Sequence, residues 1–257
     1  MKLENKNIII TGAGQGIGKE LALILGKKNN IILIGRDYVK LKLVKNELNT
    51  KNHLVVQCDI SKSFEIAKAY SIINSQFNKI DIVINNAGIS SAKKFDQYSE
   101  DEINNILDVN VKGTILFTHK FINLLKDSKG TLINIGSMFG DIAHPYYSIY
   151  SSSKFAIRGF SDAIRREYSH HGVKVFYVSP RATQTKSLAV TNNIGKHFKM
   201  NIDEPYTVAN LIINNVEKNN FYIYPKTIER TFLFVQKLFP KLIDNNLSKI
   251  AKKIHYN

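Results

Sequence analysis

Short runs of β-branched and other apolar residues recur along the chain, and helical segments separate them. Runs of this kind lie at residues 7–10, 31–34 and 82–84, a further strand is expected at 131–135, and residues 19–25 have the character of a helix. Unbroken apolar runs are typical of strands that are covered on both faces, as in a parallel sheet. The alternation therefore predicts an α/β fold, a doubly wound parallel sheet of Rossmann type with right-handed crossovers.

A glycine-rich turn connects the first predicted strand to the first predicted helix. Residues 11–18 read T-G-A-G-Q-G-I-G, which is T-G-x-x-x-G-x-G rather than G-x-G-x-x-G. Glycines allow close approach of the backbone to a pyrophosphate, and a helix N-terminus offers free N–H groups. The turn predicts a phosphate site with the candidate contacts Thr11, Gly12, Gln15, Gly16, Ile17 and Gly18.

Tyr150 and Lys154 are four residues apart, and Tyr150 follows Ser137 by thirteen residues. On a helix, this spacing places the phenol and the ammonium on one face. A lysine beside a tyrosine favours the phenolate and is expected to lower the tyrosine pKa. Such a tyrosine is suited to donate a proton to a carbonyl oxygen. The plainer interpretation of the pair alone is an exposed helical face.

Further motifs follow one another in a recognisable order. Asp59-Ile60 follows a third strand, Asn86-Ala87-Gly88 ends an N-N-A-G turn after the fourth, and Asn110 lies in D-V-N-V. From about residue 6 to 185 the chain resembles the short-chain dehydrogenase/reductase superfamily in its single-domain form. The resemblance implies a nicotinamide cofactor, with contacts from the glycine turn and from Asp59, Ile60, Asn86, Ala87, Gly88, Tyr150, Lys154, Pro180, Thr183 and Thr185.

The same resemblance implies a catalytic tetrad. Ser137 is expected to hold a substrate carbonyl, Tyr150 to exchange the proton, and Lys154 to lower the tyrosine pKa and bind the nicotinamide ribose. Asn110 is implied to anchor a water that links Lys154 to solvent. The expected activity is interconversion of a ketone or 3-oxoacyl carbonyl and a secondary alcohol by hydride transfer. A catalytically silent cofactor-binding sensor or scaffold, or a membrane-associated lipid carbonyl reductase, stays as an alternative.

The end of the second strand bears on the choice of cofactor. Gly35 stands where an NAD enzyme carries an acid for the ribose hydroxyls, and Arg36 follows it. A guanidinium suits the 2′-phosphate of NADP, so NADP(H) is favoured over NAD(H). Asp37, one residue further, would favour NAD if it occupied the acid's position, and Gln15 is not the basic residue that many NADP enzymes carry in the turn.

A polar, irregular segment follows the sixth strand. It begins at Pro180-Arg181, where the family has proline and glycine, and the resemblance implies a substrate lid at about 183–207. Arg181 either clamps a phosphate or a substrate acid, or faces solvent. The apolar lid contacts are expected from Leu188, Val190, Ile194, Phe198 and Met200.

Composition narrows the class of protein further. The 257 residues are 44% hydrophobic, without an apolar run of membrane-spanning length, and residues 1–6 lack an apolar signal core. The one cysteine, Cys58, cannot form an internal disulfide and is expected to be a buried apolar residue. No Cys/His spacing suggests a metal. A cytoplasmic location and, from the resemblance, a homodimer or homotetramer are expected.

The net charge of +15 comes with basic residues spread along the chain, without a nucleic-acid motif, so no nucleic-acid partner is expected. The predicted domain covers residues 1–228, and residues 229–257 form an amphipathic basic extension. Apolar residues on one side of this extension and lysines on the other suit either packing on the domain or a partner, or a membrane surface with peripheral association. Packing is favoured.

Overall fold

The computed structural model describes residues 2–48, 52–185, 191, 193–198 and 200–255. Its sheet has seven parallel strands in the order β3-β2-β1-β4-β5-β6-β7. The strands are β1 (Asn7–Thr11), β2 (Asn30–Gly35), β3 (Leu54–Gln57), β4 (Ile82–Asn85), β5 (Thr131–Ile135), β6 (Lys174–Val178) and β7 (Tyr222–Ile223). The predicted parallel sheet is confirmed.

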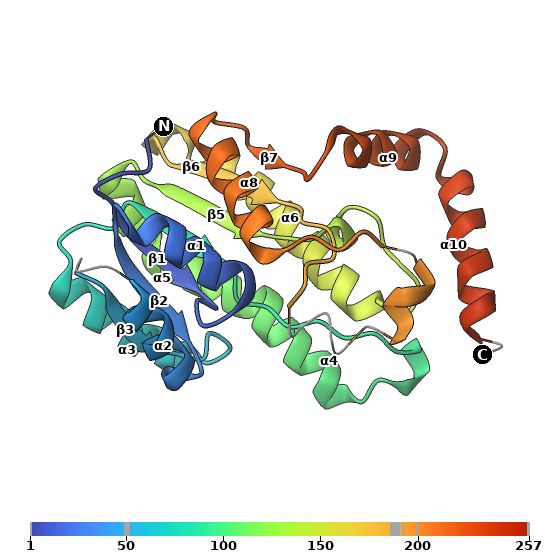
Figure 1. The fold of residues 1–257 in the computed structure, drawn as a ribbon, viewed down its shortest axis with the longest axis horizontal. Coiled ribbons are helices and arrows are strands. Elements are labelled where there is room, and N and C mark those ends of the chain that lie inside the picture. Colours follow the sequence, from blue (N-terminus) through green and yellow to red (C-terminus); the bar gives the residue numbers. More distant parts are fainter. Residues whose placement is uncertain (1, 49–51, 186–190, 192, 199, 256–257) are drawn as a thin grey trace.

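Helices cover both faces of the sheet (Figure 1). They are α1 (Gly16–Gly26), α2 (Tyr38–Glu47), α3 (Ser63–Gln76), α4 (Glu100–Leu107), α5 (Thr114–Ser128), α6 (Ser148–Glu167), α8 (Pro205–Glu217), α9 (Thr227–Leu238) and α10 (Pro240–His255). A π-helical turn, Asp108–Gly113, joins α4 to α5, and a 3-10 turn, Met138–Gly140, follows β5.

Two apolar cores lie on opposite faces of the sheet, and adjacent residues of one strand supply both. Ile8 and Ile10 pack with α1, α2 and α8, whereas Ile9 packs with α3 and α5. Each of these three side chains is fully buried. This is why the strand sequence shows no polar alternation. Cys58 lies in the second core as expected, and burial raises the pKa of its thiol to about 12.

The chain reverses its direction of winding between β1 and β4, so the carboxyl ends of both strands form the crevice in which ligands bind in such sheets. The glycine turn follows β1, the N-N-A-G turn follows β4, and Ser137 follows β5. Among the described residues, no helix is both long and apolar enough for a membrane span. The division at residue 228 stays a prediction, and α9 begins at residue 227.

Candidate active site

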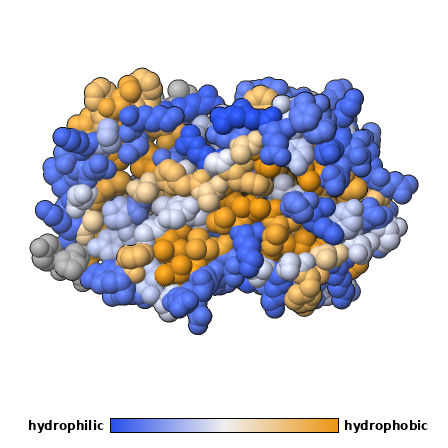
Figure 2. Space-filling view, turned by 180° about the vertical axis from the view of Figure 1, so that it is seen from behind, coloured by the Kyte–Doolittle hydropathy of each residue, from blue (hydrophilic) through white to orange (hydrophobic). Residues whose placement is uncertain are grey.

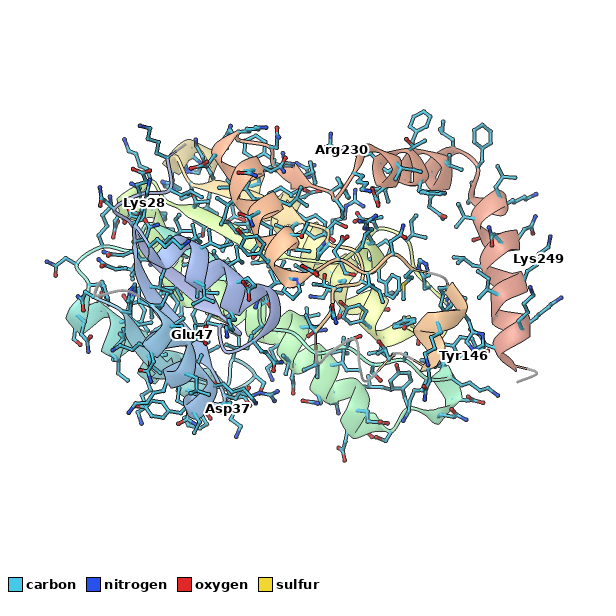
Figure 3. All side chains as sticks on the ribbon, viewed as in Figure 1. Lys28, Asp37, Glu47, Tyr146, Arg230 and Lys249 are labelled. Atoms are coloured by element: carbon cyan, nitrogen blue, oxygen red, sulfur yellow. The ribbon has the colours of Figure 1, made fainter. Side chains whose placement is uncertain are left out.

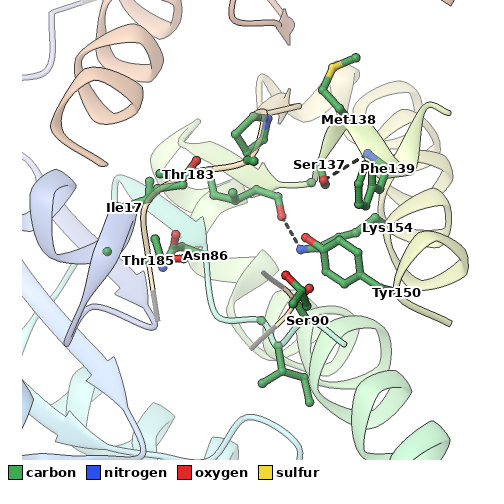
Figure 4. A pocket seen from close by; sticks show the side chains of 18 of the residues that line it. Ile17, Asn86, Ser90, Ser137, Met138, Phe139, Tyr150, Lys154, Thr183 and Thr185 are labelled. Atoms are coloured by element: carbon green, nitrogen blue, oxygen red, sulfur yellow. Dashed lines mark hydrogen bonds between the residues drawn. The ribbon is translucent and has the colours of Figure 1, made fainter. Parts of the chain in front are cut away.

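A cavity of about 740 Å³ runs from the glycine turn to the segment after β6 and the C-terminal helices. Figure 4 shows part of it, with side chains from the turns after β1, β4, β5 and β6 and from α6. The predicted site residues that line it are Gly12, Gln15, Gly16, Ile17, Arg36, Asp59, Ile60, Asn86, Ala87, Gly88, Ser137, Tyr150, Lys154, Pro180, Thr183 and Thr185. The three other predicted residues, Thr11, Gly18 and Asn110, are not part of this lining. Thr11 and Asn110 accept hydrogen bonds from the backbone of lining residues.

The turn after β1 is fastened to the turn after β4. Thr11 Oγ1 accepts hydrogen bonds from the backbone N–H groups of Asn86 (3.0 Å) and Ala87 (3.1 Å). The Asn86 amide donates to the carbonyls of Thr11 (3.0 Å) and Gly12 (3.2 Å). Gly12 has a φ of +67°, and a Cβ on Gly18 would overlap the Asn86 amide and the Gly12 carbonyl. Both glycines are therefore required by the geometry of this turn.

The first turn of α1 is suited to an anion. Gln15 occupies the N-cap position with an extended backbone, and its side chain makes no capping hydrogen bond. No acidic residue lies in this first turn. The N–H groups at this end of α1 are thus left for a ligand, and the partial positive charge of the helix favours a pyrophosphate there. The donor set fits the phosphates of a dinucleotide.

Asp37, the acid next to the end of β2, interacts with the first turn of α2. Asp37 caps α2 by accepting from the Lys40 backbone N–H (3.1 Å), and its carboxylate also pairs with the Lys40 ammonium. Gly35 ends the strand, and Arg36 is exposed at the edge of the cavity. The Asp37 carboxylate thus lines the same cavity as Arg36, but it is two residues beyond Gly35 and is engaged with α2.

Ser137, Tyr150 and Lys154 meet in the middle of the cavity (Figure 4). Ser137 Oγ accepts a hydrogen bond from the Phe139 N–H (3.2 Å), which holds the side chain at the start of the 3-10 turn. Tyr150 and Lys154 come from the first two turns of α6, and the Lys154 ammonium donates to the carbonyl of Ile135 (3.1 Å). Lys154 is buried and Tyr150 is half-buried, so the helical pair lines the cavity and is not on an exposed outer face.

The expectation of a lowered tyrosine pKa is wrong for this structure, because the pKa of Tyr150 is raised. Burial raises the pKa of Tyr150 above 10.0, and the hydrogen bond with Ser137 opposes this only in part. Burial also lowers the pKa of Lys154 to about 8. The ammonium lies 5.8 Å from the centre of the Tyr150 ring and donates to a backbone carbonyl, so desolvation is the dominant influence on both groups.

Asn110 lies in the π-helical turn, where its side chain is fully bound. Its Oδ1 accepts from the Ile89 N–H (2.8 Å), and its Nδ2 donates to the Ile89 carbonyl (2.9 Å) and to Ser153 Oγ (3.0 Å). A Cβ on Gly88 would lie 3.3 Å from Asn110 Oδ1 and 3.4 Å from Lys154 Nζ. Asn110 and Lys154 therefore both approach Gly88.

Arg181 takes neither of the two roles foreseen for it. Its guanidinium binds both carboxylate oxygens of Asp203, with Nε at 3.0 Å and Nη2 at 2.5 Å, and pairs with Glu229 at 3.1 Å. The side chain is 15% exposed. Arg181 thus joins the segment after β6 to Asp203, before α8, and to α9. Thr185 lies against Gly16, whereas Leu188 and Val190 fall outside the described residues.

A buried acid that the sequence reasoning missed supports the turn after Ser137. The Asp141 side chain is fully buried, pairs with Arg158 on α6, and accepts from Ser179 (2.5 Å) and Tyr224 (3.4 Å). Burial raises its pKa. Asp141 connects the Ser137 turn to the helix that carries Tyr150. Its partners are 17 to 83 residues away along the chain, so local sequence gave no signal for this cluster.

The outer wall of the cavity also comes from residues that the motifs did not indicate. His144 stacks on Phe139 at 4.3 Å, and burial lowers the pKa of its imidazole. The C-terminal helices contribute Phe232, Ile243, Leu247 and Ile250. The spacing of 243, 247 and 250 is a helical signal that could have indicated one buried face, but not what that face would cover.

Comparisons with known proteins agree with this geometry. Residues 6–194 match the family model for short chain dehydrogenases. An uncharacterized oxidoreductase of Staphylococcus aureus (strain MRSA252) is 34% identical over 82% of this chain and 90% of its own length. The 3-ketoacyl-(acyl-carrier-protein) reductase from Brucella melitensis, solved with NADH, is similar at TM-score 0.77 and 26% identity over 83% of this chain and 91% of that one. A short chain dehydrogenase from Burkholderia cenocepacia, solved with NADP, has the same fold at TM-score 0.81 and 21% identity, over 96% and 99% of the two chains.

Proposed function

Because the chain belongs to the short-chain dehydrogenase family and is an NAD(P)-dependent oxidoreductase, we propose that it reduces a ketone or a 3-oxoacyl carbonyl to a secondary alcohol, with Tyr150 as the proton donor. The observation that carries this proposal is the meeting of Ser137, Tyr150 and Lys154 in the cavity that begins at the uncapped end of α1. The similarity to a ketoacyl reductase favours a 3-oxoacyl substrate.

The protonation states suit the reductive direction. A nicotinamide cofactor supplies the hydride when it is bound. Ser137 donates a hydrogen bond to the substrate carbonyl oxygen and orients it. The raised pKa keeps Tyr150 protonated at neutral pH, and its O–H bond breaks as the proton passes to the carbonyl oxygen. Lys154, with a pKa of about 8, is largely protonated at neutral pH and stabilises the phenolate that is left.

Tyr150→Phe tests the assignment, with Tyr147→Phe as a matched control. Tyr147 lines the same cavity, but its hydroxyl donates to the Thr191 carbonyl (3.4 Å). NADPH oxidation is measured against ketones, aldehydes and 3-oxoacyl thioesters. We expect Tyr150→Phe to lose a factor of about 10²–10⁴ in kcat, the usual contribution of a positioned acid, and the control to stay active. Similar turnover by both variants would refute the mechanism, and bound NADPH without turnover on any substrate would favour the sensor alternative.

We further propose that the enzyme prefers NADP(H). Gly35 leaves room beside the adenosine ribose, Arg36 is exposed there to meet a 2′-phosphate, and Asp37 is held by α2. Arg36→Glu should reverse the preference by removing the cation and adding a repulsive charge. The ratio of the NADPH and NADH dissociation constants measures this. A ratio that is unchanged by Arg36→Glu, or tighter NADH binding by the parent protein, would refute it.

A further inference from the structure

The helices α9 and α10 form an arm, residues 227–255, that extends along the lid side of the domain (Figure 1). The family model matches residues 6–194 and does not include this arm. Two contacts fix its orientation. Glu229 pairs with Arg181 at the start of α9, and Tyr146 donates from its hydroxyl to the Ala251 carbonyl (3.0 Å) in α10. The arm therefore has a defined inner and outer face.

The inner face of the arm lines the substrate end of the cavity. Phe232 from α9 and Ile243, Leu247 and Ile250 from α10 line the same cavity as Tyr150. On the domain side, Phe198 and Met200 of the lid face this space. The region beyond the candidate catalytic residues is therefore largely apolar, and it suits a substrate whose carbonyl is attached to an apolar chain.

The outer face of the arm carries an unusual concentration of exposed apolar side chains. Of the fifteen exposed large hydrophobic residues in the described part of the chain, five besides the cavity-lining Phe232 lie between 228 and 242. The most exposed are Phe234 (63%), Leu242 (61%) and Phe239 (57%), around the corner between the two helices. In Figure 2 the apolar colour gathers at the upper left, where this corner lies after the turn from Figure 1. Contiguous patches of this kind mark interaction sites.

Positive charge flanks this apolar corner. The exposed lysines of the arm are Lys237, Lys241, Lys249, Lys252 and Lys253. Among the described residues these five make no ion pair. Lys249 points away from the domain in Figure 3. Asp244 is the one exposed acid in the described part of the arm, so the lysine charge is mostly uncompensated.

We propose that the arm docks on an anionic lipid surface, with Phe234, Phe239 and Leu242 in the interface and the lysines toward the headgroups. Apolar side chains flanked by lysines are the composition of interfacial helices, and each lysine near an anionic leaflet adds to binding. A second copy of the chain fits less well, because a symmetric interface would bring two uncompensated lysine rows together. The charge of the arm thus selects an anionic partner.

The consequence for the substrate rests on the proposed function. The docked outer face and the cavity wall are opposite sides of the same two helices, so the apolar end of the cavity lies next to the lipid surface. An apolar carbonyl compound that partitions into the lipid has a short path to Tyr150. The substrate class is accordingly a membrane-borne ketone or 3-oxoacyl compound with a long apolar chain.

Vesicle co-sedimentation of the full chain tests the docking without any requirement for turnover. Binding is compared on neutral phosphatidylcholine vesicles and on vesicles with about one third anionic phosphatidylglycerol. The variants are Phe234→Ser/Phe239→Ser and Lys249→Gln/Lys252→Gln/Lys253→Gln. The control is Phe64→Ser/Lys68→Gln, which removes an equally exposed phenylalanine and a lysine from one face of α3.

We expect the parent and the α3 control to bind anionic vesicles at least about tenfold more strongly than neutral ones, and less strongly at high salt. The lysine variant should lose about a hundredfold on anionic vesicles, at about fivefold for each lysine. The phenylalanine variant should lose at least about tenfold on both vesicles. Turnover of a short, water-soluble ketone should be unchanged in both arm variants.

Three results would overturn the proposal. They are no binding to anionic vesicles, equal binding by the parent and the arm variants, and a concentration-dependent dimer in analytical ultracentrifugation that Phe234→Ser/Phe239→Ser abolishes. Co-sedimentation of the Tyr150→Phe protein separates this from the proposed function, because docking needs no catalysis. Stimulation by anionic vesicles of long-chain but not short-chain ketone reduction then tests the substrate class.

Discussion

Replacing Lys154 by methionine should make the cofactor-free protein more stable at neutral pH while abolishing most of its turnover. Lys154 is buried, and burial lowers its pKa from 10.5 to about 8. At about 1.4 kcal/mol for each pKa unit, the buried ammonium costs about 3 kcal/mol of folding free energy. The loss of the hydrogen bond to the Ile135 carbonyl takes back about 1 kcal/mol. The net gain is about 2 kcal/mol.

The pH dependence of this gain identifies its cause. A lysine with a lowered pKa destabilises the folded state fully below about pH 8, where the folded and unfolded chains are both protonated. The penalty then declines as the pH rises from about 8 to 10.5, where the unfolded chain also loses the proton. The advantage of Lys154→Met should therefore shrink over this window.

Urea unfolding of the parent, Lys154→Met and the exposed-lysine control Lys68→Met measures the effect at several pH values. The cofactor is left out, because its binding to the parent would add stability by mass action. At neutral pH, Lys154→Met should also melt roughly 4–8 °C higher. A variant that is no more stable than the parent, or a gain that is the same at every pH, would refute the electrostatic reasoning.

Three further predictions follow from the site. The reductive kcat should fall as the pH rises through about 8, where Lys154 loses its charge, and a profile flat to pH 10 would contradict this. Asp141→Asn should lower the free energy of unfolding by about 2 kcal/mol in urea titrations, because an amide group in place of one carboxylate oxygen leaves Arg158 or the Ser179 hydroxyl without its acceptor, and a loss below about 1 kcal/mol would count against that cluster. Gly18→Ala should weaken NADPH binding at least about tenfold in fluorescence titrations, because the new Cβ overlaps the turn after β1. The control Gly159→Ala has open space around its Cβ and should bind NADPH normally. Equal binding by both variants would show that this overlap does not determine NADPH affinity.

The strands and the location of the site were accessible from sequence because both depend on local patterns. The run at 31–34 is apolar because β2 is covered on both sides, and parallel strands bring the turns after them to one edge of the sheet. Tertiary pairings gave no such signal. The partners of Arg181 lie 22 and 48 residues away, and only the folded chain shows that its charge is already neutralised. The direction of the Tyr150 pKa shift was predicted wrongly for a related reason, because the spacing between Tyr150 and Lys154 carries no information about burial.

The ion pairs of Arg181 set a rule for exchanging parts between related enzymes. The single guanidinium binds Asp203 at the end of the predicted lid and Glu229 at the start of the arm, so the charges of these three residues balance one another. A lid transplanted from a relative without an acid at position 203 would leave the arginine short of a partner in a site that is mostly shielded from water. Chimeras should therefore exchange the predicted lid, the arm and residue 181 together, or replace all three charged residues at once.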